Sequence, residues 1–361
     1  MAIKNKSSDE FYAGLYRLAG EKKFPLKVLF ELTYRCNFRC VHCYNVKEKK
    51  KELTTAQVKK ILTGLSKAGC FHVGFTGGEP LMRKDIFKIL DHAKRLGLRI
   101  TILTNGYLVN PGVADKIAAL GTSLNKVDIS FLGADRSTFE AITRKKGSHN
   151  KVMNAVRLLR RRDAPVMIKP TLMRQNKDEF FKIKGIADSF GCMFKYSPTL
   201  NAKTDGSKAP LQYRLSPREV SEALKSFSKG KTEPRLPRSI KILPGKNKFF
   251  RCGSGKAEAS INPYGELKLC PEINRPVYNI LKRSLPQAWK DLTRFVEKLE
   301  SARYVCKSCY LASFCNSCPA RMLVEEGSLD KCNRYDKEFA VLRAKESGNW
   351  EAIANKGTSV N

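Results

Sequence analysis

Apolar and polar positions alternate along residues 26–199 with two different periods. Short apolar runs typical of buried strands occur at 26–32, 72–76, 99–104, 127–131, 166–173 and 193–199. The segments between these runs carry apolar residues at helical spacing, and they predict helices at about 55–68, 84–97, 110–120, 150–162 and 177–190. Thr54 or Thr55 is the expected N-cap of the first of these helices. Regular alternation of about six strands and helices predicts a parallel sheet with right-handed crossovers.

Six strand–helix units are too few for a closed eight-stranded barrel, so the pattern fits either a partial barrel or an open doubly wound sheet. In both architectures the chemistry lies where the parallel strands end. A cysteine-containing loop at 36–43 follows the first strand, "TGGEP" (76–80) follows the second, and "TNG" (104–106) follows the third. We therefore expect these three features to meet on one rim of the sheet.

Charge and hydropathy restrict the possible binding partners and the cellular location of the protein. The 361 residues carry a formal net charge of +34, so we expect a basic surface that attracts an acidic peptide, an anionic small molecule or nucleic acid. A solvated basic surface without a specific partner is the alternative. Nucleic acid is disfavoured because no Lys/Arg block is interleaved with aromatic residues. The sequence has no apolar run of about 18 residues and no apolar signal segment at its start, which predicts a cytoplasmic protein without membrane spans.

Cysteine is concentrated in two places. Ten of the twelve cysteines fall either at positions 36, 40 and 43 or between 252 and 332, which in a cytoplasmic chain indicates metal ligation or catalysis rather than disulfides. The remaining two, Cys70 and Cys192, precede strands and should lie at the opposite end of the sheet as buried structural thiols. The first loop therefore offers three thiolates and no fourth. Such a loop can hold three corners of a [4Fe–4S] cluster and leave one iron open, whereas a zinc site would need further ligands.

Here the sequence resembles the radical S-adenosylmethionine (SAM) superfamily. The resemblance rests on the C-x3-C-x2-C loop of Cys36, Cys40 and Cys43 after the first strand, and on "GGEP" (77–80) after the second. It implies a partial (β/α)6 barrel in which SAM chelates the open iron of the cluster. Reduction of the cluster then cleaves SAM to methionine and a 5′-deoxyadenosyl radical, which abstracts a hydrogen atom from the substrate.

The resemblance also implies which residues contact SAM. They are Gly77, Gly78, Glu79, Pro80, Ser130 and Arg144. The glycines should allow close approach of the methionine moiety, and Glu79 should accept a hydrogen bond from its ammonium group. Asn105 is expected to shape the rim rather than bind. His42 either stacks near the adenine or packs in the fold.

The second cysteine group resembles the SPASM domain of one radical SAM subfamily. It implies two auxiliary [4Fe–4S] clusters. The first would be held by Cys252, Cys270 and Cys318, and the second by Cys306, Cys309, Cys315 and Cys332. Only two residues separate Cys315 from Cys318, where the family pattern has three. The first auxiliary cluster lacks one thiolate, and an open iron, a substrate ligand or a nearby carboxylate all remain possible; Ser254, Glu258 and Ser260 are the polar residues that follow Cys252.

The domain organisation follows from these patterns. We expect an N-terminal extension (1–25), a radical SAM core (26–200), a basic linker (201–250), a SPASM domain (251–340) and a polar tail (341–361). The linker region is distinguished by thirteen Lys/Arg against four Asp/Glu in residues 201–251.

The resemblance implies an enzyme that oxidatively modifies a peptide or protein, in the manner of maturases of ribosomally made peptides (RiPPs). Tetrapyrrole side-chain modification and sulfatase maturation are the enzyme alternatives, and an iron–sulfur electron carrier is the non-enzymatic one. We expect an acidic peptide substrate and an electron donor such as ferredoxin or flavodoxin. About 25 residues precede the first strand, too few for a winged-helix leader-binding domain. The sequence does not identify a general acid or base.

Overall fold

The computed structural model describes residues 8–46, 48–228, 252–301, 305–329 and 331–348. Residues 229–251, which include the second part of the predicted basic linker, lie outside the described residues, as do the first seven residues and the tail from 349 onward. Among the described residues, no helix is both long enough and apolar enough to span a membrane.

A single nine-stranded sheet organises the protein, in the order β6-β5-β4-β3-β2-β1-β7-β8-β9. Its first six strands are parallel, which confirms the predicted half-barrel of strand–helix units. They are β1 (Lys27–Glu31), β2 (His72–Thr76), β3 (Arg99–Thr104), β4 (Leu124–Ile129), β5 (Val166–Ile168) and β6 (Met193–Phe194). The cysteine-rich part adds β7 (Glu258–Ile261), parallel to β1, and the antiparallel strands β8 (Glu266–Lys268) and β9 (Tyr278–Asn279). β1 is therefore an interior strand.

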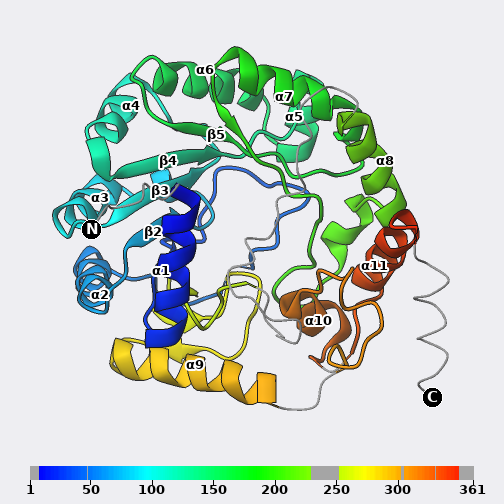
Figure 1. Cartoon of the computed structure of the whole chain (residues 1–361). Coiled ribbons are helices and arrows are strands. Elements are labelled where there is room, and N and C mark those ends of the chain that lie inside the picture. The colour runs from blue at the N-terminus through cyan, green and yellow to red at the C-terminus, as the bar shows by residue number, and fades with distance from the viewer. Residues whose placement is uncertain (1–7, 47, 229–251, 302–304, 330, 349–361) are drawn as a thin grey trace, which may run out of the picture.

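Helices cover one side of this sheet, as Figure 1 shows for α3 to α7 around the outside of the strands. The five predicted helices are α2 (Thr55–Lys67), α3 (Ile86–Arg95), α4 (Pro111–Ala118), α6 (Ser148–Arg160) and α7 (Phe180–Ser189). Six further helices were not predicted: α1 (Ser8–Lys22), α5 (Arg136–Thr143), α8 (Pro217–Ser228), α9 (Leu285–Ser301), α10 (Pro319–Glu326) and α11 (Arg334–Glu346). Thr54 is the N-cap of α2, where it forms a capping box with Gln57.

Two predicted strands are shorter in the structure. The runs at 166–173 and 193–199 form strands only as far as Ile168 and Phe194. Pro170 and Pro198 follow within a few residues, and a proline cannot donate a ladder hydrogen bond. A single parallel bridge between Thr171 and Ser197 continues the direction of the two strands.

The two faces of the sheet differ in polarity. Alternate residues such as Val28, Phe75 and Ile129 are fully buried against the helices. The residues between them point to the inner side, where charged and polar side chains such as Lys27, His72 and Asp128 replace the apolar ones. Because strand side chains alternate, one face builds the core and the other lines the interior of the half-barrel.

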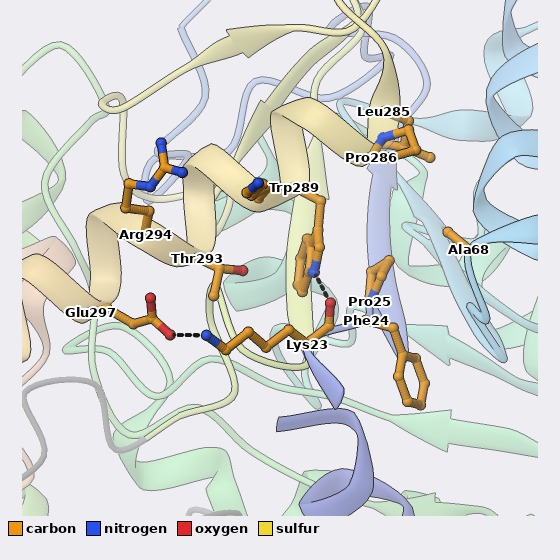
Figure 2. A pocket seen from close by; sticks show the side chains of 11 residues that line it. Lys23, Phe24, Pro25, Ala68, Leu285, Pro286, Trp289, Thr293, Arg294 and Glu297 are labelled. Carbon is orange, nitrogen blue, oxygen red and sulfur yellow. Dashed lines mark hydrogen bonds and ion pairs between the residues drawn. The ribbon is translucent and has the colours of Figure 1, made fainter. Parts of the chain in front are cut away.

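The end of the sheet where the strands begin carries none of the predicted chemistry. Cys70 and Cys192 lie there, directly before β2 and β6, and both are buried as expected. A pocket of about 550 Å³ also lies near this end, between residues 23–25, Ala68 and α9. Figure 2 shows Trp289 of α9 pointing its Nε1 at the carbonyl oxygen of Lys23, 2.7 Å away. This pocket is separate from the rim on which the cysteine loop begins.

Candidate functional site

The cysteine loop begins as an extension of β1 that is bonded to the GGEP segment. The backbone N–H of Gly78 donates to Thr33 O at 2.7 Å, and that of Glu79 donates to Arg35 O at 2.9 Å. A Cβ atom on Gly77 would lie 2.2 Å from Thr33 O, and one on Gly78 would lie 2.3 Å from Arg35 O. Only glycine therefore allows the two segments to approach this closely. This packing accounts for both glycines, and their expected approach to the SAM methionine stays a prediction.

Glu79 joins the second and third strand ends. Its side chain is fully buried and accepts hydrogen bonds from Thr104 Oγ1 (2.7 Å), Asn105 N (2.7 Å) and Leu81 N (3.1 Å). Burial raises the pKa of this carboxyl to about 7, while the donated hydrogen bonds oppose the rise. In this placement no atom of Glu79 is exposed. Its role in the structure is to hold the rim, and its bond to the SAM ammonium stays a prediction.

Asn105 connects this rim to the cysteine loop. Its Nδ2 donates to Asn37 Oδ1 at 2.9 Å and lies 3.9 Å from Cys36 Sγ, while its Oδ1 accepts from Tyr107 N. The side chain is almost fully buried. These contacts agree with the expectation that Asn105 shapes the rim.

The three thiols of the loop lie near one another; Cys36 and Cys40 are partly buried and Cys43 is exposed. Cys43 N donates to Cys40 O at 3.2 Å, which closes a turn between the two cysteines. Burial raises the pKa of the Cys36 and Cys40 thiols, and the charge of Cys43 raises both further. Three thiolates gathered in this way repel one another unless a cationic group neutralises them. This donor set fits a [4Fe–4S] cluster, whose irons bind thiolates.

Residues at the end of α5 pin the loop on its other side. Arg39 N donates to Thr143 O at 3.1 Å, and Val41 N donates to Ile142 O at 3.0 Å. Arg144 follows directly, exposed and in a left-handed conformation with φ of 51°. His42 lies between Cys40 and Cys43 in the chain. Its Nδ1 atom is buried without a hydrogen-bond partner among the described residues, and burial lowers the pKa of the ring to about 4. The half-buried ring agrees with packing in the fold, and stacking near the adenine stays a prediction.

The remaining predicted SAM contacts also lie on this rim. Ser130 follows β4 directly, is exposed, and donates its backbone N–H to Thr104 O at 3.1 Å. Pro80 is buried at the start of a short 3-10 turn (Pro80–Met82). Through Thr104, Glu79 and the loop contacts, the structure connects all the residues that the sequence proposed for SAM.

The seven C-terminal cysteines separate into two groups. Burial raises the pKa of Cys270, and so do the charges of Cys318 and Cys252. Independently, the charges of Cys306 and Cys332 raise the pKa of Cys315, and those of Cys306 and Cys309 raise that of Cys332. Among the described residues, no three His, Cys, Asp or Glu side chains are as close together as a single metal ion requires. The two ligand sets that the SPASM resemblance implies stay a prediction.

Glu272 lies with the first group and was not identified from the sequence. Its charge raises the pKa of both Cys270 and Cys318. Burial raises the pKa of Glu272 itself, against the opposing effects of Arg321 and of a hydrogen bond with Asn201. Glu258, one of the residues considered from the sequence, is instead bonded to Tyr16 and Lys27. The only available signal was the position of Glu272 two residues after Cys270.

A buried ion pair and two hydrogen bonds join the two cysteine regions. Lys268 of β8 forms an ion pair with Glu31 at 3.5 Å, and both side chains are almost completely buried. Thr204 N donates to Tyr44 O at 3.1 Å, and Thr204 O accepts from Asn274 Nδ2 at 2.7 Å. The loop after β1 and the loop after β8 are therefore held against each other.

Comparison with known proteins agrees with this geometry. The model of the radical SAM superfamily matches residues 30–184. An AdoMet-dependent heme synthase of Methanosarcina barkeri is 23% identical over 84% of this chain and 93% of that protein. The mycofactocin maturase MftC of Mycobacterium tuberculosis is 27% identical over 93% of this chain and 90% of that protein. A PqqA peptide cyclase of Rhodopseudomonas palustris is 35% identical, but over only 42% of this chain and 41% of its own length.

Solved structures show the same fold. SuiB of Streptococcus suis bound to S-adenosylmethionine superposes with a TM-score of 0.71 at 17% identity, over 92% of this chain and 84% of that chain. The enzyme anSMEcpe with bound AdoMet and a peptide superposes with a TM-score of 0.70 at 17% identity, over 93% of this chain and all of that chain. The superfamily uses SAM and a SAM-binding [4Fe–4S] cluster, which the thiols of the loop after β1 fit. The chain is thus an enzyme with a radical SAM domain at residues 30–184, and its similarity to peptide-modifying maturases such as MftC supports the SPASM-type subfamily.

Proposed function

We propose that this enzyme oxidatively modifies a peptide, as a maturase of a ribosomally made precursor. The observation that carries the proposal is the three-thiol loop bonded to the GGEP segment, in a chain that aligns over most of its length with a mycofactocin maturase. Cys36, Cys40 and Cys43 would hold the cluster. When bound, this cluster supplies the electron that splits SAM, and the 5′-deoxyadenosyl radical so produced abstracts a hydrogen atom from the peptide.

The chain's own residues would position SAM for that step. Glu79 and Asn105 fix the relative position of the cysteine loop and the strand ends. Ser130 and Arg144 are exposed on the same rim and provide a hydroxyl and a guanidinium for the SAM carboxylate. Gly77 O already accepts from Asn45 Nδ2 at 3.0 Å, so the amide of Asn45 orients this part of the rim.

Two auxiliary [4Fe–4S] clusters are the second part of the proposal. Cys252, Cys270 and Cys318 would hold the first, and Cys306, Cys309, Cys315 and Cys332 the second. We assign the missing ligand of the first auxiliary cluster to the carboxylate of Glu272, because its charge raises the pKa of both Cys270 and Cys318. Arg321, ion-paired with Asp336 at 2.7 Å, would fix Cys318, whose N–H donates to the same aspartate. These clusters would take up the electron that the oxidised peptide loses.

The partners follow from the reaction and from the charge of the protein. An acidic peptide would be attracted to the basic surface. A low-potential donor such as ferredoxin or flavodoxin would reduce the SAM-binding cluster of Cys36, Cys40 and Cys43 in the cytoplasm.

Tetrapyrrole side-chain modification is the second candidate. It is favoured by the alignment with the heme synthase, which extends over 93% of that protein. Both candidates require the same cleavage of SAM, and they differ only in the substrate.

The test is anaerobic incubation of the reconstituted enzyme with SAM and dithionite. We expect 5′-deoxyadenosine, and none from a variant in which Cys36, Cys40 and Cys43 are all replaced by alanine. If the wild-type enzyme releases no 5′-deoxyadenosine, the result contradicts the proposal and supports the iron–sulfur carrier alternative. Candidate peptides and an iron porphyrin with propionate side chains, each added to the active enzyme in the same assay, would separate the two substrate classes by the mass of the product.

A further inference from the structure

The inner face of the half-barrel carries a row of lysines. Asp128 of β4 pairs with Met167 of β5, and Met167 pairs with Met193 of β6, so the alternation of side chains places Lys126, Lys169 and Lys195 on this face. Lys126 confirms the orientation, because its Nζ lies 3.2 Å from both Met167 Sδ and Asp128 Oδ1. The intervening residues, such as Ile168, are buried against the helices.

The cations of this face outnumber the carboxylates that pair with them. Lys126 pairs with Asp128, and Lys27 of β1 pairs with Glu258. Within the part of the chain that the structure describes, the ammonium groups of Lys169 and Lys195 have neither an ion pair nor a hydrogen bond. Burial and the neighbouring lysines lower the pKa of both, and Asp128 opposes the effect. Two amines are thus held close to other cations without an anion of their own.

Their position along the strands places them at the rim. Lys169 and Lys195 directly follow the last residues of β5 and β6, as Ser130 follows β4. The charge of Glu272 acts on Lys169 and also on Tyr44, at the end of the cysteine loop. Lys169 therefore lies near both the loop that would hold SAM and the first auxiliary cysteine group, where a substrate has to bind, and Lys195 lies on the strand beside it.

We propose that Lys169 and Lys195 bind a carboxylate of the substrate and so hold it at the rim next to the SAM site. The unpaired ammonium of the half-buried Lys169 costs free energy that an anion recovers on binding, and the exposed Lys195 on the neighbouring strand adds a second positive charge. This inference rests on the proposed function and specifies its substrate class: a molecule with a carboxylate close to the carbon that reacts. The carboxylate can belong to an acidic side chain of a peptide or to a propionate of a tetrapyrrole.

The test compares Lys169→Met, Lys195→Met and the double variant with Lys88→Met, which removes an exposed lysine from α3. The reconstituted holoenzymes are titrated calorimetrically with glutarate and with neutral glutaramide at equal ionic strength. We expect the wild-type and Lys88→Met enzymes to bind glutarate and not glutaramide. Each rim variant should bind glutarate about tenfold more weakly, or ~1.4 kcal/mol. Glutarate binding that is absent from the wild type, or unchanged in both rim variants, would overturn the proposal.

Two further measurements separate this proposal from its alternatives. The KM for SAM in 5′-deoxyadenosine formation should be the same in Lys169→Met as in the wild type; a tenfold rise with unchanged glutarate binding would assign the lysine to the carboxylate of SAM instead. If neither the wild-type enzyme nor any variant forms 5′-deoxyadenosine but glutarate binds as expected, the proposed function is wrong and the anion site is still supported. Titration with acetyl-Ala-Glu-Ala-amide and with an iron porphyrin that carries propionate side chains then shows which source of carboxylate requires Lys169 and Lys195.

Discussion

Replacing Gly78 by alanine should separate the GGEP segment from the cysteine loop. The new methyl group would lie 2.3 Å from Arg35 O and 2.9 Å from Tyr34 O, both of them backbone atoms that cannot rotate away. Relief of this contact requires the two segments to move apart, which breaks the bonds from Gly78 N to Thr33 O and from Glu79 N to Arg35 O. Two such hydrogen bonds contribute about 1–3 kcal/mol, and overpacking adds about 1–3 kcal/mol. We expect a total destabilisation of about 2–6 kcal/mol, a large part of the stability of an ordinary domain.

The assay measures urea unfolding by circular dichroism, iron content after anaerobic reconstitution, and 5′-deoxyadenosine formation. The Gly78→Ala variant should lose both stability and 5′-deoxyadenosine formation at the SAM-binding cluster. Gly112→Ala is the matched control, because a Cβ at that position in α4 would lie 3.7 Å from its nearest neighbour, Asn110 Oδ1, which is an ordinary contact. This control should be as stable as the wild type or up to about 1 kcal/mol more stable. A Gly78→Ala enzyme with wild-type stability and full SAM cleavage would refute the steric reasoning.

Three other predictions concern titration, burial and ligation. Burial and nearby cations lower the pKa of His72 to about 3 in the folded protein. Between pH 6.5 and pH 3, this side chain therefore stays neutral in the folded protein but is protonated in the unfolded chain. Stability should therefore decrease as the pH falls from 6.5 towards 3, by about 2 kcal/mol at pH 5, and urea titrations of His72→Gln should lack this component. Lys268→Met leaves the carboxylate of Glu31 buried without its partner and should lower the free energy of unfolding in urea by about 3–5 kcal/mol. Adding Glu31→Gln to this variant should recover most of the loss. If Lys268→Met alone leaves the stability unchanged, the ion pair does not stabilise the fold. Glu272→Ala should change the electron paramagnetic resonance signal of the reduced auxiliary clusters, recorded with Cys36, Cys40 and Cys43 replaced, whereas an identical spectrum would remove Glu272 from the ligand set.

Much of the barrel and of the first loop was predictable because the signals are local. The period of the apolar residues defined the parallel strands, and the N-cap of α2 was visible in four consecutive residues. Cys70 and Cys192 could be excluded as ligands because strand direction alone places them at the opposite end of the sheet. The spacing of Cys36, Cys40 and Cys43, together with the exclusion of Cys70 and Cys192, predicted an open iron–sulfur site. Helix α8 was missed, since its only apolar stripe, which includes the fully buried Val220, lies within a region dominated by basic residues.

The sequence by itself therefore determined the type of chemistry, because motif spacing and strand periodicity are properties of neighbouring residues. Only the tertiary structure placed β7 beside β1, where Lys27 meets Glu258 across 231 residues of chain. The same long-range packing brings Glu272 to Cys318 and leaves Lys169 and Lys195 without carboxylates of their own. Such contacts depend on which distant surfaces bury one another, and no local pattern of residues records that choice.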